Sequence, residues 1–175
     1  VSRAMMVGYG NASSVHSAGE RARHYLRQAR EQVAAMLRAR VEDIVFTSGA
    51  TEANNLVLQS LLTGDFKGHR LVTTCVEHSS GLAAADHLAG NGVEVVILAV
   101  DENGLIDREA MLDAIEPGRT LVSITWANNE TGVLQAVPEL AEAARAAGAH
   151  FHTDAVQAVG KVPIDLETTP VDLLT

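Results

Sequence analysis

Groups able to bind a ligand or take part in chemistry follow several of the apolar runs that are typical of buried β-strands. They are Ala50 and Thr51 after residues 44–47, His78 after 71–74, Asn129 after 120–125, and Asp154 and Gln157 after 149–153. Ligands of open parallel sheets bind beyond the carboxyl ends of the strands. If the runs are parallel strands, these candidates therefore meet at one edge of a sheet.

Gly49, Ala50 and Thr51 lie where the first apolar run is expected to pass into a helix. Free N–H groups at a helix N-terminus attract a phosphate, a glycine lets the backbone approach it, and a threonine hydroxyl adds a donor. The alternative is a tight turn in which Thr51 only caps the helix. The better-known phosphate loops are missing, because no GxGxxG follows a strand and Gly160-Lys161 lacks the rest of a P-loop.

Asp154 ends an apolar run that also contains His150 and His152, and the two-residue period of a strand places all three on one face. Two imidazoles and a carboxylate could bind a metal ion, as in a metal-dependent hydrolase. The interpretation that we favour is that the histidines pack against neighbouring helices. Asp154 still needs a partner at the edge of the sheet, and a protonated ring nitrogen would be a good one.

His78 directly follows a predicted strand, where it could act on a ligand or be an ordinary surface residue. The amide side chains of Asn129 and Gln157 can bond a phenolate oxygen or tie loops together. Cys75 ends an apolar strand and is expected to be a buried, inert thiol. A phosphate site, a carboxylate for a pyridinium nitrogen, a flat ring for stacking and donors for a phenolate together match pyridoxal 5′-phosphate.

The elements that must position these groups alternate along the chain. Apolar spacing predicts a helix over residues 15–38. The further predictions are strands at 44–47, 71–74, 93–98, 120–125, 149–153 and 171–175, and helices to about residue 62, over 79–89, near 108–115 and from Pro138 to just before Gly148. This alternation predicts an α/β fold, a mostly parallel sheet flanked by helices on both faces.

The chain has 175 residues, about the length of one domain, and a net charge of −9. The acidic excess repels phosphate backbones and anionic lipid, which argues against binding nucleic acid or a membrane. The lone cysteine excludes an internal disulfide framework and suits a reducing compartment, so we expect a cytoplasmic protein. Since the chain opens without methionine and ends in a strand-like run, we expect an internal piece of a longer protein.

The sequence resembles the NifS/IscS-type cysteine desulfurases, of the aminotransferase class V group with the type I pyridoxal-phosphate fold. The matching stretches are residues 10–16 (GNASSVH), 46–52 (FTSGATE), 76–78 (VEH), 127–132 (ANNETG) and 154–161 (DAVQAVGK). Their order and spacing extend over nearly the whole chain. The resemblance implies that residues 1–175 are part of the large cofactor-binding domain, and that the small C-terminal domain is absent.

The resemblance also implies a role for each matching residue. These roles are the cofactor phosphate for Ala50 and Thr51, stacking on the pyridine ring and proton transfer for His78, the ring nitrogen for Asp154, and the phenolic oxygen for Asn129 and Gln157. A carboxylate beside the pyridinium keeps the ring protonated. A protonated ring withdraws electrons from the substrate.

The implied reaction converts L-cysteine to L-alanine and leaves the sulfur on an enzyme cysteine as a persulfide. The sulfur would then pass to iron–sulfur scaffold proteins or to tRNA-thiolation factors, and the family implies a homodimer. A selenocysteine lyase or another class V enzyme with the same cofactor is the alternative within the superfamily. A non-catalytic assembly fragment is an alternative outside enzymes.

The sequence departs from the family pattern at several positions. Ala12 stands where many members have proline. The Schiff-base lysine of the family's Ser-x-His-Lys segment is absent, because Lys67 and Lys161 lie outside any such motif. Cys75 does not match the persulfide-carrying cysteine either. We therefore expect the chain to carry most of the non-covalent cofactor pocket but neither covalent residue, and to be inactive alone.

Overall fold

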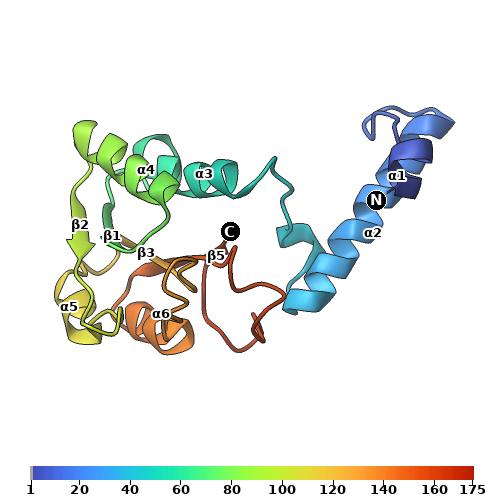
Figure 1. Cartoon of the computed structure of the whole chain (residues 1–175). Helices are drawn as coiled ribbons and strands as arrows, with labels where there is room; N and C mark the ends of the chain where they lie inside the picture. The colour runs from blue at the N-terminus through green and yellow to red at the C-terminus, as the bar shows by residue number, and fades with distance from the viewer. Residues whose placement is uncertain (1) are drawn as a thin grey trace. The chain divides into compact units, whose positions relative to one another are not determined.

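The computed structural model describes residues 2–175, which fold into two compact units (Figure 1). The first unit ends at Phe46, and the second comprises Thr47–Thr175. Within the described residues, no helix is long and apolar enough to cross a bilayer.

The first unit is helical. It contains α1 (Ser2–Val7), α2 (Ser17–Leu37) and the short 3-10 helix η1 (Val41–Asp43). The His16 side chain caps α2 by accepting a hydrogen bond of 3.2 Å from the Gly19 N–H. The predicted helix over residues 15–38 is therefore confirmed, whereas α1 and η1 were not predicted.

The predicted strand at residues 44–47 is wrong. In the structure this stretch is an irregular segment, and the side chains of Val45 and Phe46 are 69% and 43% exposed. Arg30 of α2 contacts the segment, because its Nε donates to the Ile44 carbonyl at 3.3 Å and its guanidinium lies 5.2 Å from the centre of the Phe46 ring. An apolar run indicates a strand only where a neighbouring strand pairs with it, and no strand of residues 2–175 does so here.

The second unit is built on a parallel five-stranded sheet in the order β2-β1-β3-β4-β5. Its strands are β1 (Arg70–Thr74), β2 (Val95–Leu98), β3 (Thr120–Thr125), β4 (His150–Asp154) and β5 (Leu173–Leu174). These positions confirm the other five strand predictions, although β5 is shorter than its apolar run. Parallel pairing brings the carboxyl ends of all the strands to the same edge of the sheet.

Helices cover both faces of this sheet (Figure 1). They are α3 (Ala50–Thr63) and α4 (Ser79–Gly90) on one face, and α5 (Arg108–Asp113) and α6 (Val137–Ala146) on the other. Leu71 and Leu121 pack in a core cluster with α3 and α4, whereas their neighbours Val72 and Val122 pack in a cluster with α5 and α6. The alternation of side chains along each strand thus supplies both cores, as expected for an α/β fold.

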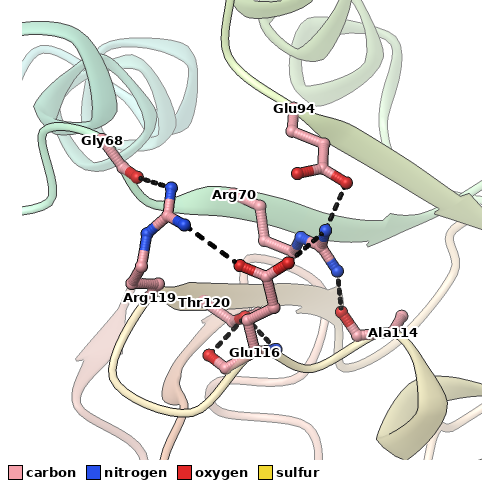
Figure 2. A network of polar contacts seen from close by, with 7 residues as sticks. All are labelled: Gly68, Arg70, Glu94, Ala114, Glu116, Arg119 and Thr120. Atoms are coloured by element: carbon pink, nitrogen blue, oxygen red, sulfur yellow. Dashed lines mark hydrogen bonds and ion pairs between the residues drawn. The ribbon is translucent and has the colours of Figure 1, made fainter.

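A polar network joins the strands at the amino edge of the sheet, away from their carboxyl ends (Figure 2). Arg70 at the start of β1 forms ion pairs with Glu94, which precedes β2, and with Glu116 at 2.8 Å. Arg119 also pairs with Glu116 at 3.3 Å and donates to the Gly68 carbonyl at 2.9 Å. The Arg70 side chain is 15% exposed, whereas Glu94 and Glu116 are 59% and 44% exposed, so the network joins the starts of adjacent strands partly at the solvent surface.

Candidate functional site

A pocket of about 90 Å³ opens at the carboxyl edge of the sheet. It is lined by Ala50, Val76, His78, Thr125, Ala127, Asn128, Asn129, Asp154, Val156 and Gln157. The structure therefore brings together the predicted residues Ala50, His78, Asn129, Asp154 and Gln157. Thr51 lies instead on the wall of a different pocket, between α3 and α4, together with Asn55 and Ser80.

The N-terminus of α3 forms one wall of the pocket. Gly49 is its N-cap residue, and no side chain caps the helix. A side chain at Gly49 would meet no atom within 4 Å, so the space beside this backbone is open. Thr51 is the second residue of the helix, and the alternative in which it acts as the cap is therefore wrong. Open space beside unsatisfied N–H groups is what a bound phosphate requires.

The loop before α3 keeps this terminus accessible. The N–H and hydroxyl of Ser48 both donate to one carboxylate oxygen of Glu52, each at 2.6 Å. These hydrogen bonds from Ser48 lower the pKa of the Glu52 carboxyl. Glu52 thus bonds back to the loop rather than covering the first turn of the helix.

Asp154, the last residue of β4, presents its carboxylate to the pocket. One oxygen accepts a hydrogen bond from Nδ2 of Asn54 at 2.7 Å, and the other accepts from the N–H of Val156 at 3.1 Å. These donors fix the orientation of the carboxylate. The sequence offered no signal for Asn54, which lies 100 positions away in the chain.

His78 caps the N-terminus of α4. Its Nδ1 accepts a hydrogen bond from the backbone N–H of Ser80 at 3.2 Å, and the Ser80 hydroxyl lies 2.7 Å from the same nitrogen. Since Nδ1 is an acceptor, a neutral ring carries its proton on Nε2. The cap therefore fixes the orientation of an imidazole whose other nitrogen is left for a ligand.

Glu77, which precedes His78, was assigned no role from the sequence. Its carboxyl lies among the strand ends, where it accepts hydrogen bonds from the Thr74 hydroxyl at 2.6 Å and the Thr125 N–H at 2.9 Å. Burial raises the pKa of Glu77 to about 7, and the charge of Asp154 also raises it. An acidic residue directly after an apolar strand was the available signal. Glu77 thus ties the His78 loop to β3.

Asn128 is a second residue without a predicted role. Its Nδ2 donates to the Val76 carbonyl at 3.0 Å, and its Oδ1 accepts from the N–H groups of Glu130 and Thr131, each at 2.9 Å. Asn128 therefore connects the loop that carries Asn129 to the loop that carries His78.

The metal interpretation of the β4 histidines finds no support in the side-chain contacts. Both ring nitrogens of His152 are within hydrogen-bond distance of hydroxyls, those of Ser123 at 2.8 Å and Thr175 at 3.2 Å. His150 packs against the Phe66 ring at 4.9 Å instead. No group of three His, Cys, Asp or Glu residues within positions 2–175 could hold a metal ion. The prediction that both histidines pack against neighbouring helices does not hold for His152, which is hydrogen-bonded between β3 and the end of the chain, while His150 packs on Phe66 just beyond α3.

The expectation of a buried thiol at Cys75 is wrong, because this residue is exposed. The strand β1 ends at Thr74, one position earlier, and the chain leaves the core there. The Cys75 N–H still bonds to the Leu98 carbonyl at 3.0 Å. Only the backbone of Cys75 therefore continues the pairing of the sheet.

The model of the aminotransferase class V family matches residues 2–175. The chain belongs to this family. A cysteine desulfurase of Bradyrhizobium diazoefficiens is 46% identical over 168 residues, which are 95% of this chain and 43% of that protein. A cysteine desulfurase of Cereibacter sphaeroides is 47% identical over 169 residues, which are 95% of this chain and 44% of that protein.

Solved structures with a similar fold agree with this assignment. A NifS-like protein superposes with a TM-score of 0.90 at 32% identity, over 98% of this chain and 48% of that one. SspA in complex with cysteine superposes with a TM-score of 0.88 at 34% identity, over 96% of this chain and 49% of that one. The α/β fold expected from the sequence is confirmed. The chain spans less than half the length of these relatives.

Proposed function

We propose that this chain is part of the large domain of a pyridoxal-phosphate-dependent cysteine desulfurase. The observation that carries the proposal is the pocket, in which the N-terminus of α3 meets the loops that follow β1, β3 and β4. These elements bring together Ala50, His78, Asn129, Asp154 and Gln157. Relatives named cysteine desulfurase, and a structural relative that holds cysteine, support this choice of substrate. The enzyme would convert L-cysteine to L-alanine and pass the sulfur onward as a persulfide.

The donor set of the pocket fits pyridoxal phosphate. The open, uncapped N-terminus of α3 at Gly49 and Ala50 would hold the phosphate. The carboxylate of Asp154 would accept a hydrogen bond from the ring nitrogen, and the imidazole of His78 would lie against the ring. When bound, the cofactor supplies an electron sink for the carbon that loses its proton. The Thr51 side chain lies beside a different pocket, so Thr51 would contribute to the phosphate site only as a residue of the first turn of α3.

The remaining lining residues would orient the ligand. The amides of Asn129 and Gln157 can donate to the phenolic oxygen. The Gln157 Oε1 accepts a hydrogen bond of 2.5 Å from the Lys161 ammonium, so its amide nitrogen remains available for a ligand. Lys161 is thereby held by Gln157 and, because it lies outside a Ser-x-His-Lys segment, would not be the covalent lysine of the family.

The full-length protein tests this function. With L-cysteine it should release L-alanine and carry a persulfide, and turnover of selenocysteine alone would favour the selenocysteine lyase alternative. Asp154→Asn should lower kcat about 100-fold or more, because the ring nitrogen loses its ionic partner. The exposed residue Asp86 on α4 provides a matched control, since Asp86→Asn should keep wild-type kcat. Equal activity of both variants would contradict the proposal.

The proposal also includes the partners, the oligomeric state and the location of the enzyme. The partners would be iron–sulfur scaffold proteins or tRNA-thiolation factors, and the enzyme would work as a homodimer in the cytoplasm. The 175-residue chain should release no alanine from L-cysteine, even with pyridoxal phosphate added, because it carries neither covalent residue of the family. Alanine release by this chain, measured by mass spectrometry, would show that the assignment of the missing residues is wrong.

A further inference from the structure

A series of side-chain hydrogen bonds extends from Asp154 through the interior of the second unit. Asn54 of α3 donates to Asp154, and the hydroxyl of Thr175 is bonded to Oδ1 of Asn54. The Thr175 hydroxyl is also 3.2 Å from Nε2 of His152, and Nδ1 of His152 is 2.8 Å from the hydroxyl of Ser123. The series thus joins β3, β4, α3 and the residue that follows β5.

Most side chains of this hydrogen-bonded series are shielded from water. The exposed fractions of Asn54, Ser123 and His152 are 3%, 5% and 1%. Buried polar groups are costly unless they are paired, so each proton in such a series must point at an acceptor. The number of protons therefore decides the direction of every hydrogen bond.

The direction follows from the charge of Asp154. An ionised carboxylate only accepts, so Asn54 must turn its Nδ2 toward Asp154 and its Oδ1 toward Thr175. Thr175 has one proton, which it donates to Asn54. Its oxygen must then accept from Nε2–H of His152.

The hydrogen bond between Ser123 and His152, at the other end of the series, has the same direction. With its proton on Nε2, a neutral His152 has an unprotonated Nδ1, which accepts the proton of Ser123. Burial lowers the pKa of His152 to about 4, so the ring is neutral at physiological pH. No group between Ser123 and Asp154 is left without a partner in this arrangement.

The reverse direction is blocked while Asp154 is ionised. If Ser123 accepted from Nδ1–H of His152, Thr175 would donate to Nε2 and Asn54 would donate to Thr175. The Oδ1 of Asn54 would then face a carboxylate oxygen at a distance that suits only a hydrogen bond. Two acceptors in contact inside the protein repel each other.

We propose that Ser123, His152, Thr175 and Asn54 form a polarised positioning network that orients the carboxylate of Asp154 as a hydrogen-bond acceptor facing the pocket. The four are positioning residues, because none of them lines the pocket, whereas Asp154 does. The network selects a ligand that presents an N–H donor to Asp154. The part of this inference that concerns the pyridine nitrogen rests on the proposed function.

The tautomer of His152 tests the network without any cofactor. Nitrogen-15 NMR of the labelled apo full-length protein at pH 7 should show that the His152 ring, assigned by loss of its signals in His152→Gln, is neutral and protonated at Nε2. A ring protonated at Nδ1, or an even mixture of the two tautomers, would overturn the proposal.

Variants at Thr175 separate the network from general damage. Thr175→Val removes the hydroxyl, so the proton of His152 should move to Nδ1, where Ser123 can accept it. Thr175→Ser keeps the hydroxyl and should keep the Nε2–H ring. Thr153→Val is the matched control, because Thr153 donates to the Ile124 carbonyl at 2.8 Å and is buried in the same strand as His152. It should leave the tautomer unchanged, and a tautomer that moves equally in both valine variants would contradict the network.

Cofactor affinity tests the end of the network that faces the pocket. Thr175→Val should weaken binding of pyridoxal phosphate to the apo full-length protein about fivefold. The same substitution should weaken binding of an analogue with carbon in place of the ring nitrogen less than about twofold, because that analogue offers no N–H to Asp154. Equal weakening of both ligands would overturn the link to the ring nitrogen. If the wild type bound neither ligand, the proposed function would fail, while the NMR result would still decide the network.

Discussion

At the scale of single residues, Glu77 and His152 in the sheet unit have pKa values that move in opposite directions. Burial raises the pKa of Glu77 from 4.5 to about 7 and lowers the pKa of His152 from 6.5 to about 4. Each group is therefore held in its neutral form over part of the pH range in which it would be charged in the unfolded chain. Both shifts lower the stability of the fold, but their pH dependences are opposite, because Glu77 costs stability at high pH and His152 at low pH.

Glu77 should cost stability as the pH rises. Between pH 4.5 and 7 the folded protein binds a proton there that the unfolded chain has released, so the contribution of Glu77 falls through this window. In urea denaturation, Glu77→Gln should gain up to about 3 kcal/mol relative to the wild type between pH 4.5 and 8. The exposed Glu102 provides the control, and Glu102→Gln should follow the wild type at every pH. A constant difference between Glu77→Gln and the wild type would contradict the raised pKa.

His152 should cost stability as the pH falls. Between pH 6.5 and 4 the unfolded chain gains a proton that the folded protein does not bind, so the stability present above pH 6.5 is lost through this window. The slopes of Glu77 and His152 largely cancel between pH 4.5 and 6.5. In Glu77→Gln the acid loss should therefore become visible as a steeper fall in the free energy of unfolding than in the wild type. If the unfolding free energies of Glu77→Gln and the wild type changed in parallel with pH in this range, the opposite pH dependences of Glu77 and His152 would be excluded.

At the scale of elements, backbone conformation decides where helices end. Gly148 follows α6 with a φ of 80°, and a Cβ there would lie 3.3 Å from Cβ of Pro117. Gly90 at the end of α4 has open space around it, and its φ lies outside the left-handed region. The two glycines therefore differ in what a methyl group would cost.

Replacement of each glycine by alanine should move stability in different directions. Gly148→Ala should lose about 1–2 kcal/mol of unfolding free energy, because alanine is strained at positive φ and crowds Pro117. Gly90→Ala should be neutral or gain a few tenths of a kcal/mol, since alanine favours helix. Thermal and urea unfolding of the two variants checks this contrast. Equal losses of unfolding free energy in the two variants would show that the backbone conformation at residue 148 does not cause the loss in Gly148→Ala.

At the scale of the whole molecule, the sheet unit contains its own hydrophobic core clusters and both of its polar edges. Both clusters of the sheet unit, one with α3 and α4 and one with α5 and α6, consist entirely of residues beyond position 46. The polar network at the amino edge and the pocket at the carboxyl edge also lie within Thr47–Thr175. The sheet unit therefore contains everything that its own packing requires.

A chain of residues 47–175 should fold without the first unit. We expect a single cooperative urea transition with a midpoint close to that of the corresponding transition of residues 1–175, because the core clusters are retained. The Nε2–H tautomer of His152 should also persist in this shorter chain. A molten, non-cooperative transition would show that residues before position 47 are needed for the sheet.

Much of the pocket could be predicted from the residues alone. His78, Asn129, Asp154 and Gln157 each follow an apolar run, and parallel strands place such positions at one edge whatever the details of packing. Thr51 shows the limit of this reasoning. It is adjacent to Ala50 in the chain, but the first turn of α3 directs neighbouring residues toward different pockets.

Contacts between distant segments required the tertiary structure. Asn54 reaches Asp154 because α3 packs on the sheet with one particular side facing β4, and helical periodicity does not define that rotation. Val45 and Cys75 are exposed for a related reason, since an apolar residue is buried only where another element covers it. Periodicity and the order of the elements thus set the fold class and the edge at which the site lies. The packing of helix on sheet decided which polar groups meet there, because hydrogen bonds depend on distance and direction that no local pattern encodes.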